Sequence, residues 1–514
     1  MNPPALTERD REQIAAHGLD LAEVERQLRL FAAPPPRLRL LRPCRVGDGI
    51  VRIEAGETAG LVAAAEQAAR SGRFRVFVPA SGAATRMFES LLAATSEPST
   101  LADLERRAGA GDAASADATR FWRHRHEFPF HDDLLAAVRR RGGDPEDVNV
   151  CLAALLAADG LAYGDLPKAL VAFHRAGDGP RTPFEEQILE AAAYATDAGS
   201  LCRVHFTIAA CHEPAFRNLA ERTRVALART AGIHLEVDFS HQDPATDTIA
   251  VDLANRPFRQ PDGSLLFRPG GHGALLANLS ALQGDIVFVK NIDNSLPERG
   301  RPRVVLWKKL LGGLLVRLQS RIFEYLERLE SAEATPEDLA SALAFAEEEL
   351  GYRMPAPLRA AALERRRQAL LALLDRPLRV CGVVANQGQP GGGPFWVEGP
   401  RGDERQIVEA AQVDPDSDSQ REIWSTATHF NPVDIVCGLR DRLGRQYDLR
   451  HWVDRRAILL STKFGGGRRL KVLEHPGLWN GGMARWNTVF VEVPAETFAP
   501  VKTVLDLLRP EHRP

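Results

Sequence analysis

Strand-like segments alternate with helical patterns between residues 71 and 325, and this alternation limits the possible fold more than any other feature of the chain. Four segments are rich in apolar, β-branched or aromatic residues, as buried strands are: residues 74–78, 201–208, 234–239 and 286–292. A helix between two such strands returns the chain to the same end of the sheet, so the strands run parallel. The sequence therefore predicts an α/β domain with a mostly parallel sheet flanked by helices.

The rest of the chain divides into regions of different composition. Short helical patterns broken by consecutive prolines predict an N-terminal helical layer. Strongly helical sequence follows the α/β region, and strand patterns with tight-turn glycines return near the C-terminus. We expect a helical layer over residues 1–70, an α/β domain over 71–325, a helical segment over 326–376 and a C-terminal α+β region over 377–514.

Composition excludes several functional classes. The 65 Lys and Arg residues and 68 Asp and Glu residues give a formal net charge of −3, so nucleic acid and anionic membranes are not expected partners. The six cysteines are scattered, which indicates neither a zinc ribbon nor a disulfide framework. No signal-like N-terminus or uncharged apolar run of roughly 18 residues is present. We expect a soluble, cytoplasmic protein that uses local cations for any phosphate chemistry.

A turn of small residues follows the first of the predicted strands. It contains Ser81, Gly82, Ala83 and Thr85, and Arg86 comes just before a helical pattern. Small side chains let backbone N–H groups approach phosphate oxygens, and a helix dipole adds about half a positive charge at its N-terminus. The segment is a candidate phosphate-binding loop, although an ordinary strand-to-helix turn has the same composition.

A carboxylate and an amide, Asp293 and Asn294, follow the last of the predicted strands. Open α/β sheets bind ligands at the carboxyl ends of their strands. About 20 residues earlier, His272 stands between Gly271 and Gly273 in a glycine-rich loop. Structural alternatives remain at each position, because Asp293 could cap the next element and the glycines could form a plain turn.

These segments resemble the nucleotide-sugar pyrophosphorylases, and most of all the eukaryotic-type UTP:sugar-1-phosphate uridylyltransferases. The resemblance is carried by residues 81–87, the Pro167-Lys168 pair, residues 239–242, the glycine loop around His272, residues 291–294, and Lys502 near the C-terminus. The whole chain, including residues 428–434 and 476–481, also resembles a bacterial group, domain-of-unknown-function family 4301, which names no reaction. The resemblance implies a nucleotidyltransferase-like, Rossmann-type fold.

The resemblance also implies a reaction. A sugar-1-phosphate oxygen attacks the α-phosphorus of a nucleoside triphosphate, and pyrophosphate leaves. Such transfer depends on positioning and on positive charge around the phosphoryl oxygens. Arg86 would hold the leaving pyrophosphate, Lys168 the α-phosphate, and Lys502 the sugar phosphate or the developing charge. Asp293 would ligate Mg²⁺, which prefers carboxylate and phosphate oxygens.

Further residues are implied as ligand contacts, in two sets. The nucleotide set is Ser81, Gly82, Ala83, Thr85, Gln242, Gly271, His272 and Gly273, and the sugar set is Asn294, His429, Asn431 and Asp434. UTP is favoured because the segment around Gln242 resembles the one that reads the uracil edge. The polar cluster around His429 fits a buried turn equally well, and no pattern fixes the sugar or the oligomeric state.

Two features depart from the family's pattern. Ala84 stands where a glycine is usual, and alanine costs about 1 kcal/mol if the position needs a positive φ. About eighty residues separate Arg86 from Lys168, so we expect a helical insertion over residues 96–160 that sits over the active site. Its Ala-, Gly-, Asp- and Ser-rich part, residues 108–119, predicts a flexible loop. These departures leave open a protein of another class, a catalytically inactive nucleotide- or nucleotide-sugar-binding protein.

Metal-dependent hydrolysis is a weaker alternative. His124, His126, Glu127 and His131 lie close together in the sequence. A zinc protease needs a His-Glu-x-x-His pattern on one helical face, whereas Pro129 interrupts a helix here and the spacing differs.

Overall fold

The computed structural model describes residues 6–177, 179–388, 391–399, 402–465 and 467–513. The first five residues of the expected N-terminal layer lie outside this set. The chain forms two compact units. Unit 1 comprises Met1–Ala65, Gln242–Phe288 and Leu310–Pro494, and unit 2 comprises Glu66–His241, Val289–Lys309 and Ala495–Pro514.

Unit 1 contains most of the strands. Six adjacent strands have the order β2 (Arg45–Val46), β3 (Gly49–Val51), β18 (Asn487–Glu492), β12 (Leu378–Ala385), β15 (His429–Gly438) and β11 (Ile286–Val289). Strand β12 runs parallel to β18 and antiparallel to β15, and β3 runs parallel to both of its neighbours. A smaller sheet has the order β1 (Leu40–Pro43), β13 (Gly393–Gly399) and β14 (Gly402–Val408). Strand β9 (Thr248–Ile249) forms an antiparallel pair with β10 (Phe267–Arg268). A second antiparallel pair consists of β16 (Leu459–Gly465) and β17 (Arg468–Glu474).

Helices complete unit 1. The predicted N-terminal helices are present as α1 (Glu8–Ala16) and α2 (Leu21–Ala32), and a buried cluster packs them against β9 and β17. The other helices are α11 (Leu275–Ala281), α13 (Pro336–Glu348), α14 (Ala356–Arg359), α15 (Leu363–Leu374) and α16 (Asp418–Ser425). Helices α3 (Thr58–Arg70) and α12 (Arg301–Glu330) each include residues of both units.

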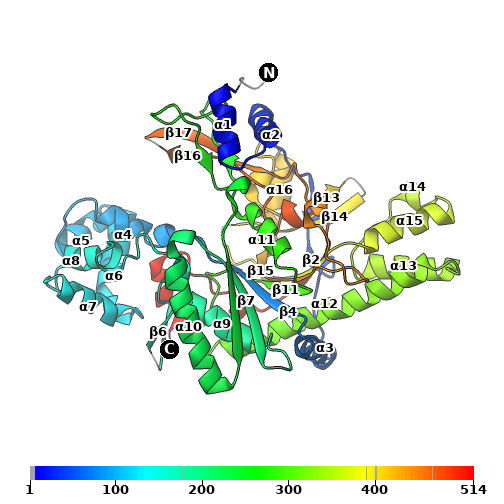
Figure 1. Cartoon of the computed structure of the whole chain (residues 1–514), viewed down its shortest axis with the longest axis horizontal. Helices are drawn as coiled ribbons and strands as arrows, with labels where there is room; N and C mark the ends of the chain where they lie inside the picture. The colour runs from blue at the N-terminus through cyan, green and yellow to red at the C-terminus, as the bar shows by residue number, and fades with distance from the viewer. Residues whose placement is uncertain (1–5, 178, 389–390, 400–401, 466, 514) are drawn as a thin grey trace. The chain divides into compact units, whose positions relative to one another are not determined.

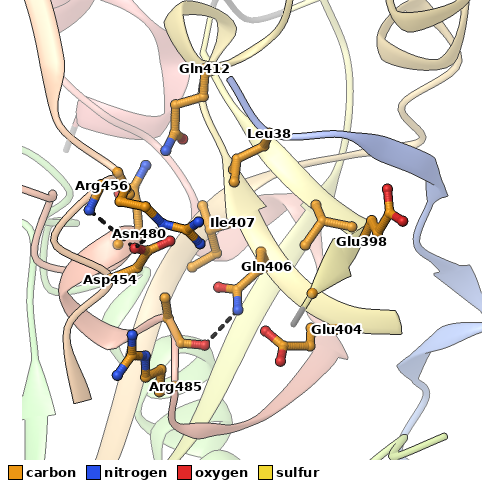
Figure 2. Close-up of a pocket in the computed structure, with 15 residues that line it drawn as sticks. Leu38, Glu398, Glu404, Gln406, Ile407, Gln412, Asp454, Arg456, Asn480 and Arg485 are labelled. Atoms are coloured by element: carbon orange, nitrogen blue, oxygen red, sulfur yellow. Dashed lines mark hydrogen bonds and ion pairs between the residues drawn. The ribbon is translucent and has the colours of Figure 1, made fainter. Parts of the chain in front are cut away.

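A cavity lies inside unit 1, between the strands of its smaller sheet and the chain near Asp454 (Figure 2). Its lining includes Gln406, Arg456, Asn480 and Arg485, and Arg456 Nε lies 3.3 Å from Asp454 Oδ1. The volume is about 70 Å³. Ligand pockets usually measure roughly 300–1,000 Å³, so this cavity is too small for a nucleotide.

Unit 2 is built around three adjacent parallel strands, β4 (Phe74–Pro79), β7 (Leu201–Thr207) and β8 (His234–Ser240). Helices α9 (Pro183–Ala192) and α10 (Glu213–Ala231) pack against β7 and β8 (Figure 1). A short hairpin consists of β5 (His174–Ala176) and β6 (Gly179–Arg181). With the mostly parallel pairing among the six adjacent strands of unit 1, these strands confirm the predicted α/β class. No helix in the described part of the chain combines the length and hydropathy of a membrane span.

The start of α9 follows directly from the sequence. Thr182 accepts a hydrogen bond from Glu185 N, the Glu185 side chain accepts one from Thr182 N, and Pro183 occupies the first turn. This reciprocal capping box satisfies two backbone donors that a helix otherwise leaves unpaired. The helix therefore begins at the residue that the capping pattern predicts.

The segment between Arg86 and Lys168 is helical, and it contains α4 (Glu89–Ala94), α5 (Leu101–Gly109), α6 (Ala113–Arg123), α7 (His131–Arg140) and α8 (Val148–Leu156). The prediction of a flexible loop over residues 108–119 is wrong, because only a short turn separates α5 from α6. Asp112 caps α6 by accepting a hydrogen bond from Ser115 N. An N-cap carboxylate and a run of alanines favour a helix, and these signals prevail over the small-residue composition.

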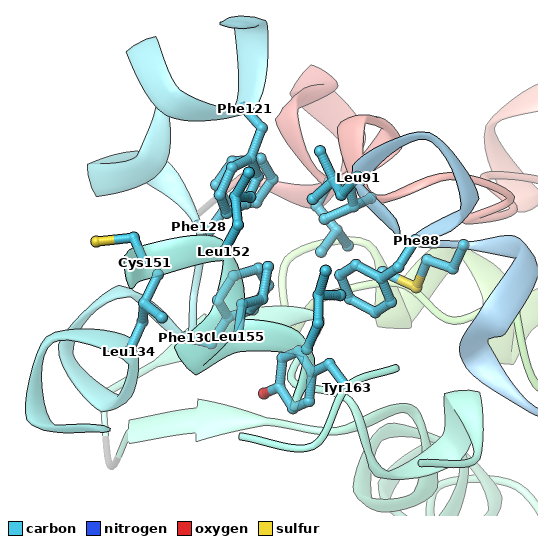
Figure 3. Packing of buried hydrophobic residues seen from close by; sticks show 14 of the residues in the cluster. Phe88, Leu91, Phe121, Phe128, Phe130, Leu134, Cys151, Leu152, Leu155 and Tyr163 are labelled. Carbon is cyan, nitrogen blue, oxygen red and sulfur yellow. The ribbon is translucent and has the colours of Figure 1, made fainter. Parts of the chain in front are cut away.

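An aromatic core holds this insertion together (Figure 3). Phe121 and Phe128 pack with ring centroids 4.9 Å apart, and Phe128 and Phe130 with centroids 5.3 Å apart. The same core includes buried side chains from the last residues of the chain: Val501, Val504, Leu505, Leu507 and Leu508. The insertion therefore provides the surface on which the C-terminal segment folds.

Candidate functional site

The predicted phosphate-binding turn lies beside the predicted lysine loop within unit 2. After β4, the Gly82 carbonyl accepts a hydrogen bond from Lys168 N (3.0 Å), and Ala84 N donates to the Leu166 carbonyl (2.9 Å). These two bonds form a short antiparallel bridge between segments that are about eighty residues apart. The turn and Lys168 consequently share one edge of the unit.

Ala84 does not carry the strain that a positive φ would impose. It begins the 3-10 helix η1 (Ala84–Arg86), its side chain is buried, and it is not among the described non-glycine residues with positive φ. Gly82, Ala83 and Thr85 are exposed, and the Thr85 hydroxyl donates to the Gly164 carbonyl at 3.5 Å. Three of the small residues of the turn therefore lie at the surface, while the Ala84 N–H and the Gly82 carbonyl are used in the bridge to the lysine loop.

Three of the predicted residues meet in a cluster that we call the lysine–carboxylate cluster: Lys168, Asp293 and Lys502. Lys502 Nζ lies 2.7 Å from Asp293 Oδ2, and Lys168 Nζ lies 3.6 Å from the same oxygen. Lys168 Nζ also donates to the Val501 carbonyl at 2.9 Å. Lys168 and Asp293 side chains are only 14% and 10% exposed, whereas Lys502 is 61% exposed. The site thus combines a mostly buried lysine and carboxylate with one more exposed cation.

The cluster carries one positive charge in excess, because two ammonium groups face a single carboxylate. Burial lowers the pKa of Lys168, and the attraction of Asp293 offsets this only in part, while Lys502 adds a further lowering. An anion bound here would relieve the repulsion between the two lysines. Asp293 Oδ1 is buried and has no hydrogen-bond partner among the described residues, so it is an acceptor without a donor.

Amide side chains fix the turn that carries Asp293. Gln187 Nε2 donates to the carbonyls of Asn291 (3.3 Å) and Asn294 (3.1 Å). The Asn294 amide donates to the Thr497 carbonyl (3.2 Å) and accepts from Ala499 N (3.0 Å). Both polar atoms of Asn294 thereby tie the C-terminal segment to the Asp293 turn. Its sugar contact stays a prediction, and the contacts it makes here are with the chain itself.

A buried ion cluster precedes this turn in the chain, and the sequence analysis missed it. Lys290 Nζ lies 2.8 Å and Lys308 Nζ 3.8 Å from Glu190 Oε1, and all three side chains are buried. Burial raises the pKa of Glu190, but the two lysines outweigh this effect and hold the pKa below its usual value. Burial also lowers the pKa of Lys308 well below that of a free lysine. Lys290 was a visible signal, since it interrupts an otherwise apolar run.

Arg86 and the histidine-rich segment stand apart from the cluster. Arg86 is exposed, and no contact joins it to Lys168, Asp293 or Lys502 in the described part of the chain, so its predicted role stays a prediction. His124 Nδ1 lies 2.5 Å from Glu127 Oε1. The described residues contain no group of three or more His, Cys, Asp or Glu side chains arranged to hold a metal ion.

The glycine loop around His272 belongs to unit 1, where it packs against the chain that follows β17. Side chains at Gly270 and Gly273 would clash with backbone atoms of Thr246 and Pro476, and Gly271 has a φ of +74°. These contacts account for the glycines by close backbone approach. His272 Nδ1 accepts a hydrogen bond from Leu478 N (3.1 Å). The predicted nucleotide contacts of Gly271, His272 and Gly273 remain predictions.

His272 also stacks on Trp479, with ring centroids 4.4 Å apart. Because its Nδ1 accepts a hydrogen bond, the neutral ring carries its proton on Nε2. Burial lowers the pKa of His272, which favours this neutral form. Glu409 Oε1 lies 3.9 Å from Nε2, so the ring is held by stacking and by its backbone contact rather than by a close ion pair.

The other predicted ligand contacts also lie in unit 1. Gln242 is half-buried at the start of one of its segments. His429 Nε2 lies 3.4 Å from Glu492 Oε1, and Thr428 Oγ1 lies 2.9 Å from His429 Nδ1. Asn431 Oδ1 is buried without a partner among the described residues, and Asp434 is buried in β15. Their predicted roles are untested, because this geometry is equally that of a polar strand end.

Comparisons with known proteins were made on the whole chain. A family model described as "Domain of unknown function (DUF4301)" matches residues 7–513. No curated protein sequence matches the chain.

Among solved structures, the chain is similar to a UDP-N-acetylglucosamine pyrophosphorylase from Trypanosoma brucei, with 13% identity, a TM-score of 0.46, and coverage of 98% of this chain and 79% of that one. It is also similar to a variant UDP-glucose pyrophosphorylase from Leishmania major, with 12% identity, a TM-score of 0.45 and the same coverage. TM-scores below 0.5 do not establish a common fold, so the chemistry of this chain rests on its own residues.

Proposed function

The chain belongs to the DUF4301 family, and from this premise we propose that it is a nucleotidyltransferase that transfers UMP from UTP to a sugar-1-phosphate and releases pyrophosphate. One observation carries the proposal. Lys168, Asp293 and Lys502 come from distant parts of the sequence and meet at one point of unit 2, beside the exposed turn of small residues. Surface lysines gain little from such an arrangement, whereas phosphoryl transfer requires it.

The cluster has the charge that the reaction needs. Attack on the α-phosphorus spreads negative charge over the phosphoryl oxygens, and positioned cations stabilise it. Lys168 is held rigidly by the Val501 carbonyl and by Asp293, so it suits a fixed contact with the α-phosphate. Lys502 is more exposed and suits the incoming sugar phosphate. The backbone N–H groups of the small-residue turn that its bridge to the lysine loop does not use would bind the phosphates of the nucleotide.

Magnesium fits the donor set of this site as a proposed cofactor. Asp293 Oδ1 is a hard, buried oxygen without a hydrogen-bond donor among the described residues. Mg²⁺ is usually bound by one or two carboxylates together with substrate phosphates and water, so a single protein ligand is sufficient. When bound, the ion would neutralise phosphate charge. Asp293 would hold it through Oδ1 while Oδ2 keeps both lysines in place.

The alternative of an inactive nucleotide-binding protein loses one of its two reasons, since Ala84 is unstrained. The second reason, the long insertion, has a structural role, because its core supports the segment that carries Lys502. We therefore favour the enzyme over the binding protein.

The test is product formation. The full chain is incubated with Mg²⁺, UTP and a panel of hexose-1-phosphates, and pyrophosphate and the nucleotide-sugar are quantified separately. We expect both products in equal amounts with at least one sugar phosphate, and their loss when EDTA removes the metal. Nucleotide binding detected by a thermal shift, without any product from UTP or the other triphosphates, would establish the inactive protein instead.

A further inference from the structure

The C-terminal segment has little regular structure of its own, although it carries Lys502. After Lys502 it forms only two short 3-10 helices, η11 (Val504–Leu508) and η12 (Pro510–His512). Asp506 Oδ2 accepts hydrogen bonds from Lys502 N (2.8 Å) and Thr503 N (2.7 Å), which sets the local backbone. Chain ends are poorly ordered unless they are tied down, so the position of Lys502 depends on what anchors this segment.

Contacts anchor this segment on both sides of Lys502. Beside it, Val501 N donates to the Asp293 carbonyl (3.0 Å) and Val504 N donates to the Met87 carbonyl (3.0 Å). Two further anchors lie before Lys502 and at the end of the chain. Before Lys502, the Asn294 side chain bonds to the backbone of Thr497 and Ala499. After it, His512 is buried against His174 of the β5–β6 hairpin. His174 Nε2 lies 2.9 Å from His512 Nδ1, and the two rings are stacked with centroids 5.2 Å apart.

His174 is itself held from the other side. Its Nδ1 lies 3.1 Å from Glu186 Oε1, and Glu186 Oε2 lies 2.9 Å from Arg301 Nη2. Ionised Glu186 can only accept, so His174 donates through Nδ1 and, when neutral, accepts through Nε2. His512 Nδ1 is then the donor to His174. The donors and acceptors of His512, His174 and Glu186 thus form one continuous hydrogen-bonded series, which begins on the C-terminal segment.

His174 has to be neutral to accept through Nε2, whereas His512 carries a proton on Nδ1 as the donor in either of its charge states. Burial and the neighbouring His174 lower the pKa of His512 to about 3, and Arg509 acts in the same direction while Asp506 opposes it. Glu186 contacts His174, and Arg301 contacts Glu186, so these two charged groups lie on the His174 side of the histidine pair. At neutral pH His512 is therefore uncharged, and it donates to His174 as a neutral ring.

We propose that His512 is a positioning residue of the active site: its contact with His174 fixes the end of the chain so that Lys502 lies against Asp293. The catalytic consequence rests on the proposed function, whereas the placement of Lys502 does not. His512 lies ten residues beyond Lys502 and does not touch the cluster, so its effect passes through the backbone between them.

The experiment uses three variants of the full chain. His512→Phe keeps an aromatic ring for stacking but removes the hydrogen bond, and His512→Gln keeps a donor that can reach His174. His451→Phe is the matched control, because His451 is 78% exposed in unit 1. Two quantities are measured: kcat and KM for the nucleotide, and the rate at which an amine-specific reagent labels Lys502, read by mass spectrometry with Lys463 as the internal reference.

We expect His512→Phe to lower kcat by about 10- to 100-fold, because a displaced catalytic group loses its orientation, with little change in KM. Labelling of Lys502 should become several-fold faster relative to Lys463. His512→Gln should recover part of both values, and His451→Phe should match the wild type. A general structural role would not separate Lys502 from Lys463 in this way.

The outcomes separate the two proposals. If the wild type forms no product, the proposed function fails, and the labelling rates still decide whether His512 places Lys502. If His512→Phe labels Lys502 at the wild-type rate, the positioning role is overturned even when the enzyme is active. If His512→Phe does not fold, the Gln variant decides in the same two measurements.

Discussion

Two lysines face a single oxygen of Asp293, and the other oxygen of this carboxylate is buried without a hydrogen-bond donor among the described residues. Lys168 is buried and doubly held, and Lys502 reaches the carboxylate from a segment without regular structure. At the level of residues, the candidate site therefore combines a mostly buried cation with a more exposed one. This division suits a reaction in which one phosphate is bound first and a second one arrives.

The buried cluster of Glu190, Lys290 and Lys308 offers a prediction at the same scale. Glu190→Gln would remove the buried carboxylate that Lys290 and Lys308 both face, so we expect the free energy of unfolding to fall by about 3–5 kcal/mol. Urea unfolding measures this quantity. Glu66→Gln is the matched control, since it removes an exposed partner of Lys309 and should cost no more than about 1 kcal/mol. Equal stability of the two variants would show that Glu190 does not balance this charge.

The residues of the cluster could be predicted from the sequence, but their supporting residues could not. Asp293 stands out because a carboxylate follows an apolar strand, and Lys168 is identified by the resemblance of the Pro167-Lys168 pair to the pyrophosphorylases. Gln187 and His512 give no such signal. A glutamine inside a helix and a histidine near a chain end both have ordinary local patterns. Gln187 contacts a residue 104 positions away and His512 contacts one 338 positions away, so these contacts depend on the tertiary fold.

At the scale of elements, the insertion and the C-terminal segment form one core. Phe121 of α6 is fully buried in this core, together with Val504 and Leu505 from the end of the chain. That the insertion sits over the active site stays a prediction, while its core packs against the segment that carries Lys502. The residues between Arg86 and Lys168 thus have a structural role in supporting this segment.

Phe121→Ala tests this support. Removing a buried phenylalanine leaves a cavity, and we expect a loss of about 3–5 kcal/mol in the free energy of unfolding of the insertion. Lys502 should also become more reactive towards an amine-specific reagent, since its segment shares the core. Phe464→Ala, at a residue that is 75% exposed, is the control and should change neither quantity. If Phe121→Ala is destabilised but Lys502 still reacts at the wild-type rate, the insertion does not support the segment that carries Lys502.

Elements with strong local signals were predicted well, and those with ambiguous composition were not. The apolar runs became β4, β7, β8 and β11, and the capping box placed the start of α9. The segment around Asp112 was predicted as a loop because alanine, glycine and serine are common in both loops and helices. The capping carboxylate of Asp112 decided the outcome, which shows that caps carry more information than composition here.

At the scale of the whole molecule, lowering the pH should reduce the free energy of unfolding because of His512. Its pKa is about 3 in the folded protein and roughly 6.5 in the unfolded chain. Between these pH values only the unfolded chain binds the proton. This stabilisation is therefore complete above pH 6.5 and is lost as the pH falls, by up to about 1.4 kcal/mol per pH unit.

The measurement is urea unfolding at pH 7 and pH 5, compared between the wild type and His512→Phe. The wild type should lose about 2 kcal/mol more than the variant over this interval, since phenylalanine takes up no proton. His451→Phe is the control, because an exposed histidine should leave the dependence on pH unchanged. The same slope in the wild type and His512→Phe would mean that His512 titrates alike in both states.

The central claim is that Lys502 acts at the carboxylate of Asp293 in nucleotidyl transfer. Turnover of Lys502→Ala, with UTP, Mg²⁺ and the preferred hexose-1-phosphate, tests it most directly, beside Lys463→Ala as a lysine control from unit 1. We expect turnover to fall by roughly 10²- to 10³-fold in Lys502→Ala, as when one transition-state donor is lost, and to stay at the wild-type value in Lys463→Ala. Wild-type turnover in Lys502→Ala would contradict the claim.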